Sequence, residues 1–415
     1  MGDQADKAED YKPLDGIKVL DMSRVLAGPW AGQIFADLGA EVIKIERPGV
    51  GDDTRAWGPP FLKDKDGNET REAGYYLSVN RGKKSLALDI HKAEGQDVIK
   101  RLVKDCDILV ENFKVGGLKK YGLDYDSLKA INPGLIYLSV TGFGQSGPYA
   151  PRAGYDFIIQ AMGGLMSITG ERDDLPGGGP QKVGIAVSDV FTGMYGVIGC
   201  LAALHNRQKT GQGAHVDMAL LDSLVSILSN QNNLWLIGGQ VPKRMGNAHA
   251  SIVPYEAFKT KDTYLVLAVG NDRQYAAFKK VAGDDRLNSD RYITNPDRVR
   301  YRESLIPIVK EVMLTRTTDE WLQALEPVGV PAGPINTIDK IFDDPQVKAR
   351  GLKVDLDHPL SGTVPSVLNP FTFNGQQIGA ETAPPLLGEH TNTILEAFGF
   401  DAETVAKLRA DKIIE

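Results

Sequence analysis

The sequence predicts an α/β protein whose larger domain is a doubly wound, mostly parallel sheet of the Rossmann-like type. Short β-branched segments recur along the first third of the chain, and segments with helical spacing separate them. Strands that alternate with helices in this way form parallel sheets with helices on both faces. Basic residues lie near the predicted strand ends, where such folds bind their ligands. After residue 237 the pattern changes to antiparallel strands followed by charged helices, which predicts a smaller α+β domain.

Hydrophobic periodicity predicts the elements of the large domain. In chain order, we expect a strand over 17–20, a helix over 29–38, a strand over 41–45, a strand over 85–88, a helix over 93–104, a strand over 107–110, a helix around Ser127, a strand over 135–140 and a long apolar helix over 220–237. The first three of these elements make a βαβ unit.

The later part of the chain predicts the smaller domain. Residues 251–269 are expected to form two antiparallel strands around a turn at 260–263, and charged helices follow. From Asp344 the chain is rich in proline, and it ends in a helix from Asn392. The predicted division is a disordered tail over 1–12, a large domain over 13–225, a linker over 226–250, a small domain over 251–340 and a C-terminal segment over 341–415.

Composition excludes several classes of protein. The 415 residues carry a net charge of −7, which argues against a general nucleic-acid-binding protein. Cys106 and Cys200 lie in apolar surroundings and are expected to be buried thiols, and the six histidines show no metal-binding spacing. The N-terminus resembles no targeting signal, and the apolar run Val190–Leu204 is short for a membrane span. We therefore expect a cytoplasmic protein with no metal, nucleic-acid or membrane partner.

The stretch 182–204 holds a candidate nucleophile. Its apolar run Val183–Val187 predicts a buried strand, and the small residues that follow Asp189 predict a tightly packed helix. Ser188 or Asp189 could cap that helix through a side-chain oxygen. Alternatively, Asp189 is a nucleophilic carboxylate that the helix dipole keeps ionised. The residues alone leave both interpretations open.

Two further patterns concern anion binding. Gly142–Gly147 matches the dinucleotide fingerprint G-x-G-x-x-G, but Pro148 and Pro151 follow it, so a loop without a pyrophosphate-binding helix is expected. Basic residues near strand ends form either a solvated face or a site for one polyanionic ligand, such as a 3′-phospho-ADP group: Arg47, Arg81, Lys83, Lys84, Lys119 and Lys120. These patterns predict an anion site but name no reaction.

Seven motifs, in order, make the chain resemble the family III CoA-transferases, also called the CaiB/BaiF family. They are PLDGIKVLDMSRVLAGPWAG, DLGAEVIKIERPGVGDDTR, NRGKKSLALDI, DILVENFKVGGLKKYGL, the Asp189 segment, GVPAGPIN and PLLGEHT. The strings GDDTRAWGPPF and RMGNAHASIVPYEAF most resemble members that use succinyl-CoA and glutarate. The resemblance implies a CoA-transferase that acts on an acyl-CoA and a short dicarboxylic acid.

The resemblance also implies a mechanism and a set of CoA contacts. The family's nucleophile carries over to Asp189, which forms an acyl-aspartyl anhydride and then an aspartyl-CoA thioester. Water must be excluded, because both intermediates hydrolyse. The expected CoA contacts are Leu26, Ala27, Arg47, Leu88, Asp89, Ile90, His91, Asn112, Phe113, Lys114 and Lys120. Lys120 replaces an arginine of the formyl-CoA:oxalate relatives, which keeps the charge but loses a bidentate grip.

The acceptor acid needs a cation for its second carboxylate. Arg24 is the first candidate, and the other expected substrate contacts are Arg152, Tyr155, Asp156, Arg244 and His249. The alternative is that Arg24 pairs only with a phosphate or a neighbouring acid. A formyl-CoA:oxalate activity, an acyl-CoA racemase or epimerase, and a catalytically silent CoA-binding homologue are the competing functions. Tyr155 argues against the racemase, whose branch has a histidine in this segment.

The family resemblance implies a homodimer of interlocked chains. Each chain is expected to form a ring, because linkers join the large and small domains and the C-terminal segment returns to the large domain. The changed pattern after residue 237 fits such a path.

Overall fold

The computed structural model describes residues 11–415, so residues 1–10 of the expected tail lie outside the described part. Tyr11 and Lys12 of the expected tail are described, and the Tyr11 ring lies 5.1 Å from that of Phe373. The chain divides into two compact units, which we describe separately: a first unit of Met1–Leu165, Val183–Asn233 and Gln346–Glu415, and a second unit of Met166–Lys182 and Leu234–Pro345.

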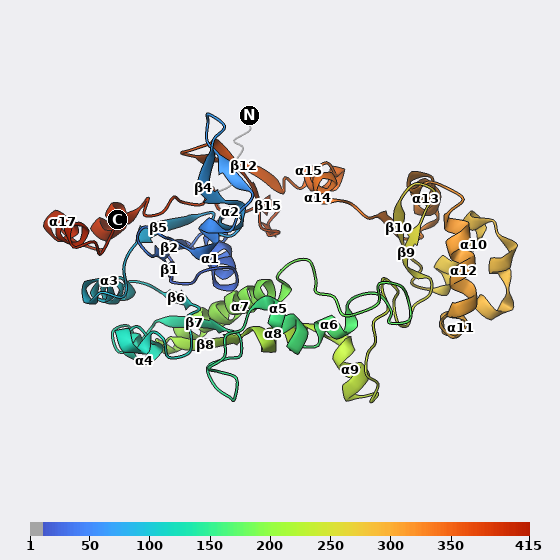
Figure 1. Cartoon of the computed structure of the whole chain (residues 1–415), viewed down its shortest axis with the longest axis horizontal. Coiled ribbons are helices and arrows are strands. Elements are labelled where there is room, and N and C mark those ends of the chain that lie inside the picture. The colour runs from blue at the N-terminus through green and yellow to red at the C-terminus, as the bar shows by residue number, and fades with distance from the viewer. Residues whose placement is uncertain (1–10) are drawn as a thin grey trace, which may run out of the picture. The chain divides into compact units, whose positions relative to one another are not determined.

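A six-stranded parallel sheet forms the centre of the first unit (Figure 1). Its spatial order is β5-β2-β1-β6-β7-β8, and every neighbouring pair is parallel. The strands are β1 (Lys18–Asp21), β2 (Glu41–Glu46), β5 (Lys83–Ala87), β6 (Ile108–Glu111), β7 (Ile136–Thr141) and β8 (Ala214–Ala219). The mostly parallel α/β sheet is thus confirmed, and β8 is the strand that the periodicity missed.

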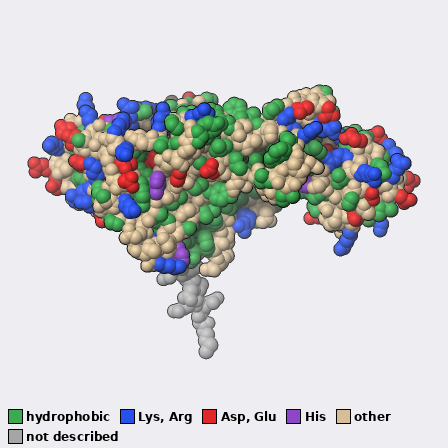
Figure 2. Space-filling model, turned by 90° about the horizontal axis from the view of Figure 1, so that it is seen from below, with side chains coloured by type: hydrophobic (Ala, Val, Ile, Leu, Met, Phe, Trp, Pro, Cys, Tyr) green, Lys and Arg blue, Asp and Glu red, His purple; other side chains and the backbone are tan. Residues whose placement is uncertain are grey.

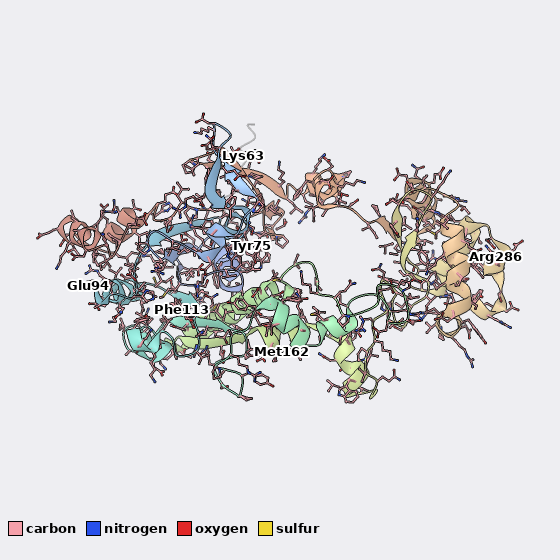
Figure 3. All side chains as sticks on the ribbon, in the orientation of Figure 1. Lys63, Tyr75, Glu94, Phe113, Met162 and Arg286 are labelled. Carbon is pink, nitrogen blue, oxygen red and sulfur yellow. The ribbon has the colours of Figure 1, made fainter. Side chains whose placement is uncertain are left out.

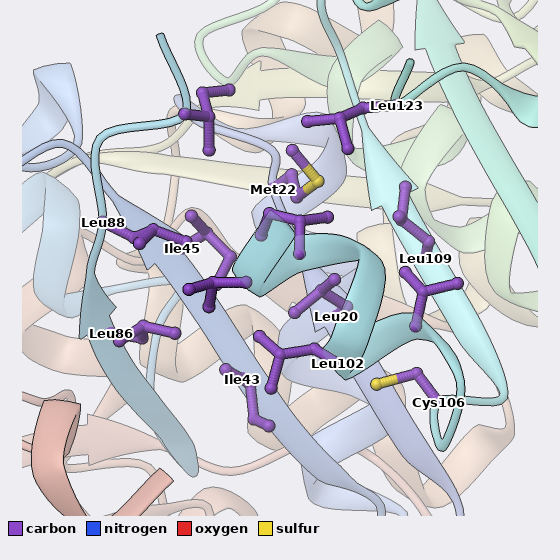
Figure 4. Packing of buried hydrophobic residues seen from close by; sticks show 14 of the residues in the cluster. Leu20, Met22, Ile43, Ile45, Leu86, Leu88, Leu102, Cys106, Leu109 and Leu123 are labelled. Carbon is purple, nitrogen blue, oxygen red and sulfur yellow. The ribbon is translucent and has the colours of Figure 1, made fainter. Parts of the chain in front are cut away.

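Helices cover both faces of this sheet because successive strand residues point to opposite sides. Leu20, Ile43 and Leu109 face one core, part of which Figure 4 shows, while Val19, Val42 and Ile108 face the other. The first core is covered by α3 (Ala93–Val103), α4 (Tyr125–Lys129), α16 (Thr391–Ala397) and α17 (Ala402–Ala410). The second is covered by α1 (Ala27–Asp37), α5 (Asp156–Met162), α7 (Val187–Thr210) and α8 (Leu220–Ile227).

The predicted strand over 183–187 is wrong. Residues 181–186 have no regular structure, Ile185 is 61% exposed, and α7 already begins at Val187. The tight packing of the helix is confirmed, because a Cβ at Gly193 would lie 2.6 Å from the carbonyl oxygen of Ala27. The helix is long and apolar enough to cross a membrane by length and composition, but here one face packs against α1, β7 and β8.

Other predicted boundaries also differ. The long helix over 220–237 is two helices, α8 and α9 (Asn230–Leu236), separated at Ser229, whose φ of 50° interrupts helical geometry. The remaining elements of the first unit are β3 (Phe61–Lys63), β4 (Glu69–Ala73), α2 (Gly74–Leu77), β12 (Lys353–His358), β13 (Gly362–Val367), β14 (Thr372–Phe373) and β15 (Gln376–Gln377), with α6 (Leu165–Ile168), α9 and α15 (Pro345–Ala349) at its boundaries.

The second unit has a core of its own around the buried side chains of Phe258, Phe278 and Trp321. Its antiparallel sheet has the order β11-β10-β9, and the predicted pair around the turn at 260–263 is confirmed. The elements are β9 (Tyr255–Lys259), β10 (Tyr264–Ala268), α10 (Asp272–Ala282), α11 (Asn295–Arg300), α12 (Arg302–Met313), α13 (Thr318–Leu325), β11 (Ala332–Pro334) and α14 (Ile338–Ile341).

Candidate active site

A cavity of about 820 Å³ lies at the carboxyl ends of the parallel strands of the first unit. Its walls come from the loops that follow β1, β2, β5, β6 and β7 and from the first turn of α7. The sequence-predicted residues that line it are Arg24, Leu26, Ala27, Arg47, Leu88, Asp89, Ile90, His91, Asn112, Phe113, Lys114, Lys120, Arg152, Tyr155 and Asp189. Phe113, labelled in Figure 3, belongs to the loop after β6.

Asp156, one of the expected substrate contacts, is not among the residues that line this cavity. Its Oδ1 accepts a hydrogen bond from the backbone N–H of Ser188 at 2.8 Å, and its Oδ2 accepts one from Gln160 Nε2 at 2.7 Å. Asp156 therefore caps the N-terminus of α7 from a neighbouring helix. The expected cap by Ser188 or Asp189 is wrong, since the N-cap residue is Ala186 and no side chain within the helix makes that bond.

Arg244 and His249 belong to the second unit, so they are not among the walls of the cavity in the first unit. Arg244 forms an ion pair with Asp173 and donates to the carbonyl oxygen of Ser167. The His249 ring lies 5.4 Å from that of Tyr255. Both side chains therefore have partners within their own unit.

Asp189 is the third residue of α7 and lines the cavity. Burial, together with the negative charge of Asp156, raises the pKa of its carboxyl group to about 7. The helix dipole would lower this pKa, but here burial and the neighbouring acid outweigh it. The dipole is therefore not sufficient to keep the pKa of Asp189 in the usual range of an aspartate. Near pH 7 the carboxyl group of Asp189 is therefore present in both its protonated and its ionised form.

The loop between β1 and α1 is held in an unusual conformation at the floor of the cavity. Val25 has a φ of 73°, a region that β-branched residues rarely adopt. Its N–H donates to Asp52 Oδ1 at 3.2 Å, while the Asn112 side chain accepts from the N–H of Arg24 and donates to its carbonyl oxygen. Asn112 thus positions the loop that carries Arg24 and Leu26, in addition to lining the cavity.

Buried ion pairs support this floor, and the sequence reasoning missed them. Lys44 Nζ lies 2.8 Å from Asp52 Oδ2, and both side chains are 0% exposed. Burial alone would raise the pKa of Asp52, but Lys44 lowers it to about 2. A second buried ion pair joins Arg55 and Glu46, with Arg55 Nε 2.8 Å from Glu46 Oε1. A lysine in the middle of the apolar strand EVIKIE was the signal that an acidic partner lies close.

The basic residues expected to form one anion site do not all lie at the cavity. Arg81, Lys83 and Lys84 pair with the carboxylates of Asp37, Asp21 and Glu41 respectively. None of these three cations lines the cavity, and neither does Lys119. Arg47 and Lys120 do line it, and Lys120 Nζ lies 4.7 Å from the centre of the Tyr121 ring. The polyanion site is therefore smaller than expected.

As predicted, the glycine loop at 142–147 is not a dinucleotide-binding turn. The next helix, α5, begins only at Asp156. A Cβ at Gly142 would lie 2.5 Å from the Cα of Gly154, so the glycine allows two backbones to meet at the wall of the cavity. Cys106 and Cys200 are confirmed as buried free thiols, and burial raises the pKa of each to about 12. In residues 11–415 no group of three or more His, Cys, Asp or Glu is placed to hold a metal ion.

Comparison with known proteins identifies the family. Residues 14–391 match the family model described as CoA-transferase family III. A succinate–glutarate CoA-transferase of Agrobacterium fabrum is 50% identical over 92% of this chain and 95% of its own length. The human succinyl-CoA:glutarate CoA-transferase is 44% identical over 98% of this chain and 91% of its own.

The fold gives the same answer. The crystal structure of a CaiB/BaiF family protein from Brucella suis superimposes with a TM-score of 0.84 at 47% identity, covering 94% of this chain and 100% of that one. The chain therefore belongs to the family III CoA-transferases.

Proposed function

We propose that this protein transfers CoA from succinyl-CoA to glutarate or a similar short dicarboxylic acid. The observation that supports this most is the joint lining of one cavity by Asp189 and all eleven expected CoA contacts. The two relatives named after succinate or succinyl-CoA and glutarate support the choice of donor and acceptor. The acyl-CoA and the acid are both substrates, so the reaction needs no resident cofactor.

The proposed reaction begins with attack by an Asp189 carboxylate oxygen on the thioester carbonyl carbon. The C–S bond breaks, CoA leaves as the thiolate, and an acyl-aspartyl anhydride remains. The thiolate then attacks the aspartyl carbonyl, which releases succinate and gives an aspartyl-CoA thioester. Attack by the acceptor carboxylate and return of the thiolate yield the new acyl-CoA and restore Asp189. Because Asp189 must be ionised to attack, its raised pKa bears directly on the rate.

A single assay tests the proposed function against its alternatives. The protein is incubated with succinyl-CoA and, separately, glutarate, oxalate and a monocarboxylate, and new acyl-CoA products are identified by mass spectrometry. Glutaryl-CoA formation supports the proposal, whereas oxalyl-CoA as the main product favours the oxalate type. Exchange of an α-proton of a 2-methylacyl-CoA without transfer favours a racemase. The absence of all three reactions contradicts the proposal.

The pH dependence of transfer should follow Asp189. Its pKa is raised to about 7, so the carboxyl group is protonated below that pH and the reactive anion is lost. We expect kcat/KM for succinyl-CoA to rise about tenfold per pH unit below about 7 and to level off above it. Asp156→Asn, which removes the neighbouring charge, should move this midpoint to lower pH. A profile that is flat from pH 5 to 8 in the wild type would contradict this assignment.

Arg24 should select dicarboxylates. Its guanidinium lines the cavity and pairs with Asp53 at 2.8 Å, an exposed contact of the kind worth at most about 1 kcal/mol. A substrate carboxylate can therefore replace Asp53. We expect glutarate to exceed butyrate as acceptor, and Arg24→Ala to reduce that preference by on the order of 2 kcal/mol. Arg24→Lys is the matched control for charge. Equal use of butyrate and glutarate by the wild type would exclude this role.

The proposed assembly is an interlocked homodimer. In the first unit, Phe157, Ile158 and Met162 of α5 and Met194 and Ile198 of α7 are between 42% and 58% exposed. Hydrophobic side chains gather on the face seen in Figure 2, and an apolar surface of this kind fits a second copy of the chain. The chain also passes between the two units after Leu165, Lys182, Asn233 and Pro345, as a ring requires.

Sedimentation tests this assembly. We expect a dimer at all concentrations down to nanomolar, because interlocked chains separate only after unfolding. A matched pair of variants, Ile198→Asp on the exposed apolar face and Ile293→Asp in the second unit, 58% and 57% exposed, should differ, with only the first reducing dimer yield during refolding. A folded monomer at micromolar concentration would refute the interlocked arrangement.

A further inference from the structure

A smaller hollow of about 400 Å³ adjoins the main cavity, and Arg47 and Asp89 line both. The other walls of this side hollow come from Pro48 and Gly49 in the loop after β2 and from Lys412, Ile414 and Glu415 near the end of α17. The hollow thus lies between two segments that are more than 360 residues apart in the sequence. The roles proposed above make no use of it beyond Arg47 and Asp89.

The direction of the main cavity determines which end of CoA reaches the side hollow. Asp189 lines the cavity together with Thr141 and Gly142, at the end of β7, whereas Arg47 and Asp89 follow β2 and β5. Four strand spacings of about 4.8 Å separate β7 from β5, or about 19 Å. If the thioester reaches Asp189, as the proposed function requires, the nucleotide of CoA extends toward Arg47 and the side hollow.

Residues 412–415 are firmly attached at this place. The side chains of Ile413 and Ile414 are buried in the core of the first unit. The N–H of Asp89 donates to the carbonyl oxygen of Ile413 at 2.8 Å, and Ile414 pairs with Leu88 in a β-bridge. The N–H of Gly49 donates to Glu415 Oε2 at 2.6 Å. The segment therefore joins both loops that carry the expected nucleotide contacts.

Lys412 has a defined backbone conformation within this segment. Its φ is 56°, which residues other than glycine adopt only when the surrounding contacts determine it. Its N–H donates to the carbonyl oxygen of Arg409, and the N–H of Ile413 donates to that of Leu408, as at the end of many helices. This turn places Lys412 in the wall of the side hollow.

We propose that Lys412 and Arg47 bind the 3′-phosphate of CoA in the side hollow. A phosphomonoester carries up to two negative charges and favours two cations that donate charge-assisted hydrogen bonds. Within residues 11–415, the ion pairs of the structure include neither Arg47 nor Lys412. Of the two acidic side chains of the wall, Glu415 accepts from the N–H of Gly49. Asp89 accepts from the N–H of His91; burial would raise the pKa of Asp89, but the hydrogen bonds from His91 and the nearby charge of Arg47 lower it.

Calorimetric titration with CoA and with 3′-dephospho-CoA tests this site. The second ligand keeps the pyrophosphate, so it separates the two phosphate sources within CoA. We expect Lys412→Gln to weaken CoA binding about tenfold and to leave 3′-dephospho-CoA binding within about twofold of wild type. Lys412→Arg should retain most of the CoA affinity. Lys407→Gln, at an exposed lysine of α17 just before this turn, should change neither affinity.

Each outcome decides one question. An equal loss for both ligands assigns Lys412 to the pyrophosphate or to the fold and overturns the proposal, as does no loss for either. The titration reads binding without turnover, so the 3′-phosphate site can stand even if succinyl-CoA is not the donor. A wild-type protein that binds neither ligand would instead refute the proposed function together with this site.

Discussion

Asp189→Asn is expected to reduce CoA transfer by at least about 10⁴-fold, because removing a nucleophile eliminates the covalent route. The asparagine amide has nearly the same shape and can remain in the first turn of α7. The backbone N–H of Ser188 would still donate to Asp156, so the cap of the helix is preserved. CoA affinity should therefore change little, and the loss should appear in kcat.

The control for this variant is Asp222→Asn. Asp222 lies in the first turn of α8 but is exposed and does not line the cavity, so full activity is expected. Mass spectrometry of the wild type after brief exposure to acyl-CoA should show a CoA-sized adduct on the peptide that contains Asp189. A variant that retains more than about 1% of activity, or an adduct on another peptide, would contradict the nucleophile assignment.

Most of the parallel sheet was predictable because its strands are buried on both faces. Such strands appear as short β-branched runs, so five of the six were located from periodicity alone. The strand β8 was not, because at the sheet edge it carries His215 and Asp217 between smaller apolar residues. The opposite error occurred at 183–187, an apolar run that the fold leaves largely outside the core.

The cavity lining was predictable only through the family motifs, and the contacts between distant residues were not predictable at all. Asp156, expected as a substrate contact, also caps a helix that begins 31 residues later. The pairing of Lys44 with Asp52 and the approach of Lys412 to Arg47 also depend on how separate segments meet. Local pattern can mark a buried lysine such as Lys44, but it does not identify the partner, since each of these residue types is common on an exposed surface.

Lys44→Met should destabilise the first unit by about 3–5 kcal/mol, because the carboxylate of Asp52 would remain buried without its partner. Asp52 also accepts hydrogen bonds from the N–H groups of Val25 and Thr54, so the loop at the floor of the cavity should loosen. The matched control is Lys84→Met on the adjacent strand β5. Lys84 pairs with Glu41 at the surface, and its loss should cost no more than about 1 kcal/mol. Scanning calorimetry measures both.

The double variant Lys44→Met with Asp52→Asn distinguishes a stranded charge from lost packing. Asparagine keeps an oxygen that accepts from Thr54 and Val25 but carries no charge, so the buried, uncompensated carboxylate disappears. We expect the double variant to recover at least about half of the stability lost by Lys44→Met, since most of that loss is the cost of the unpaired anion. Acid should have the same effect on Lys44→Met alone, because protonation of Asp52 also removes the anion. A double variant as unstable as the sum of the two single changes would show that the pair contributes through packing and not through charge.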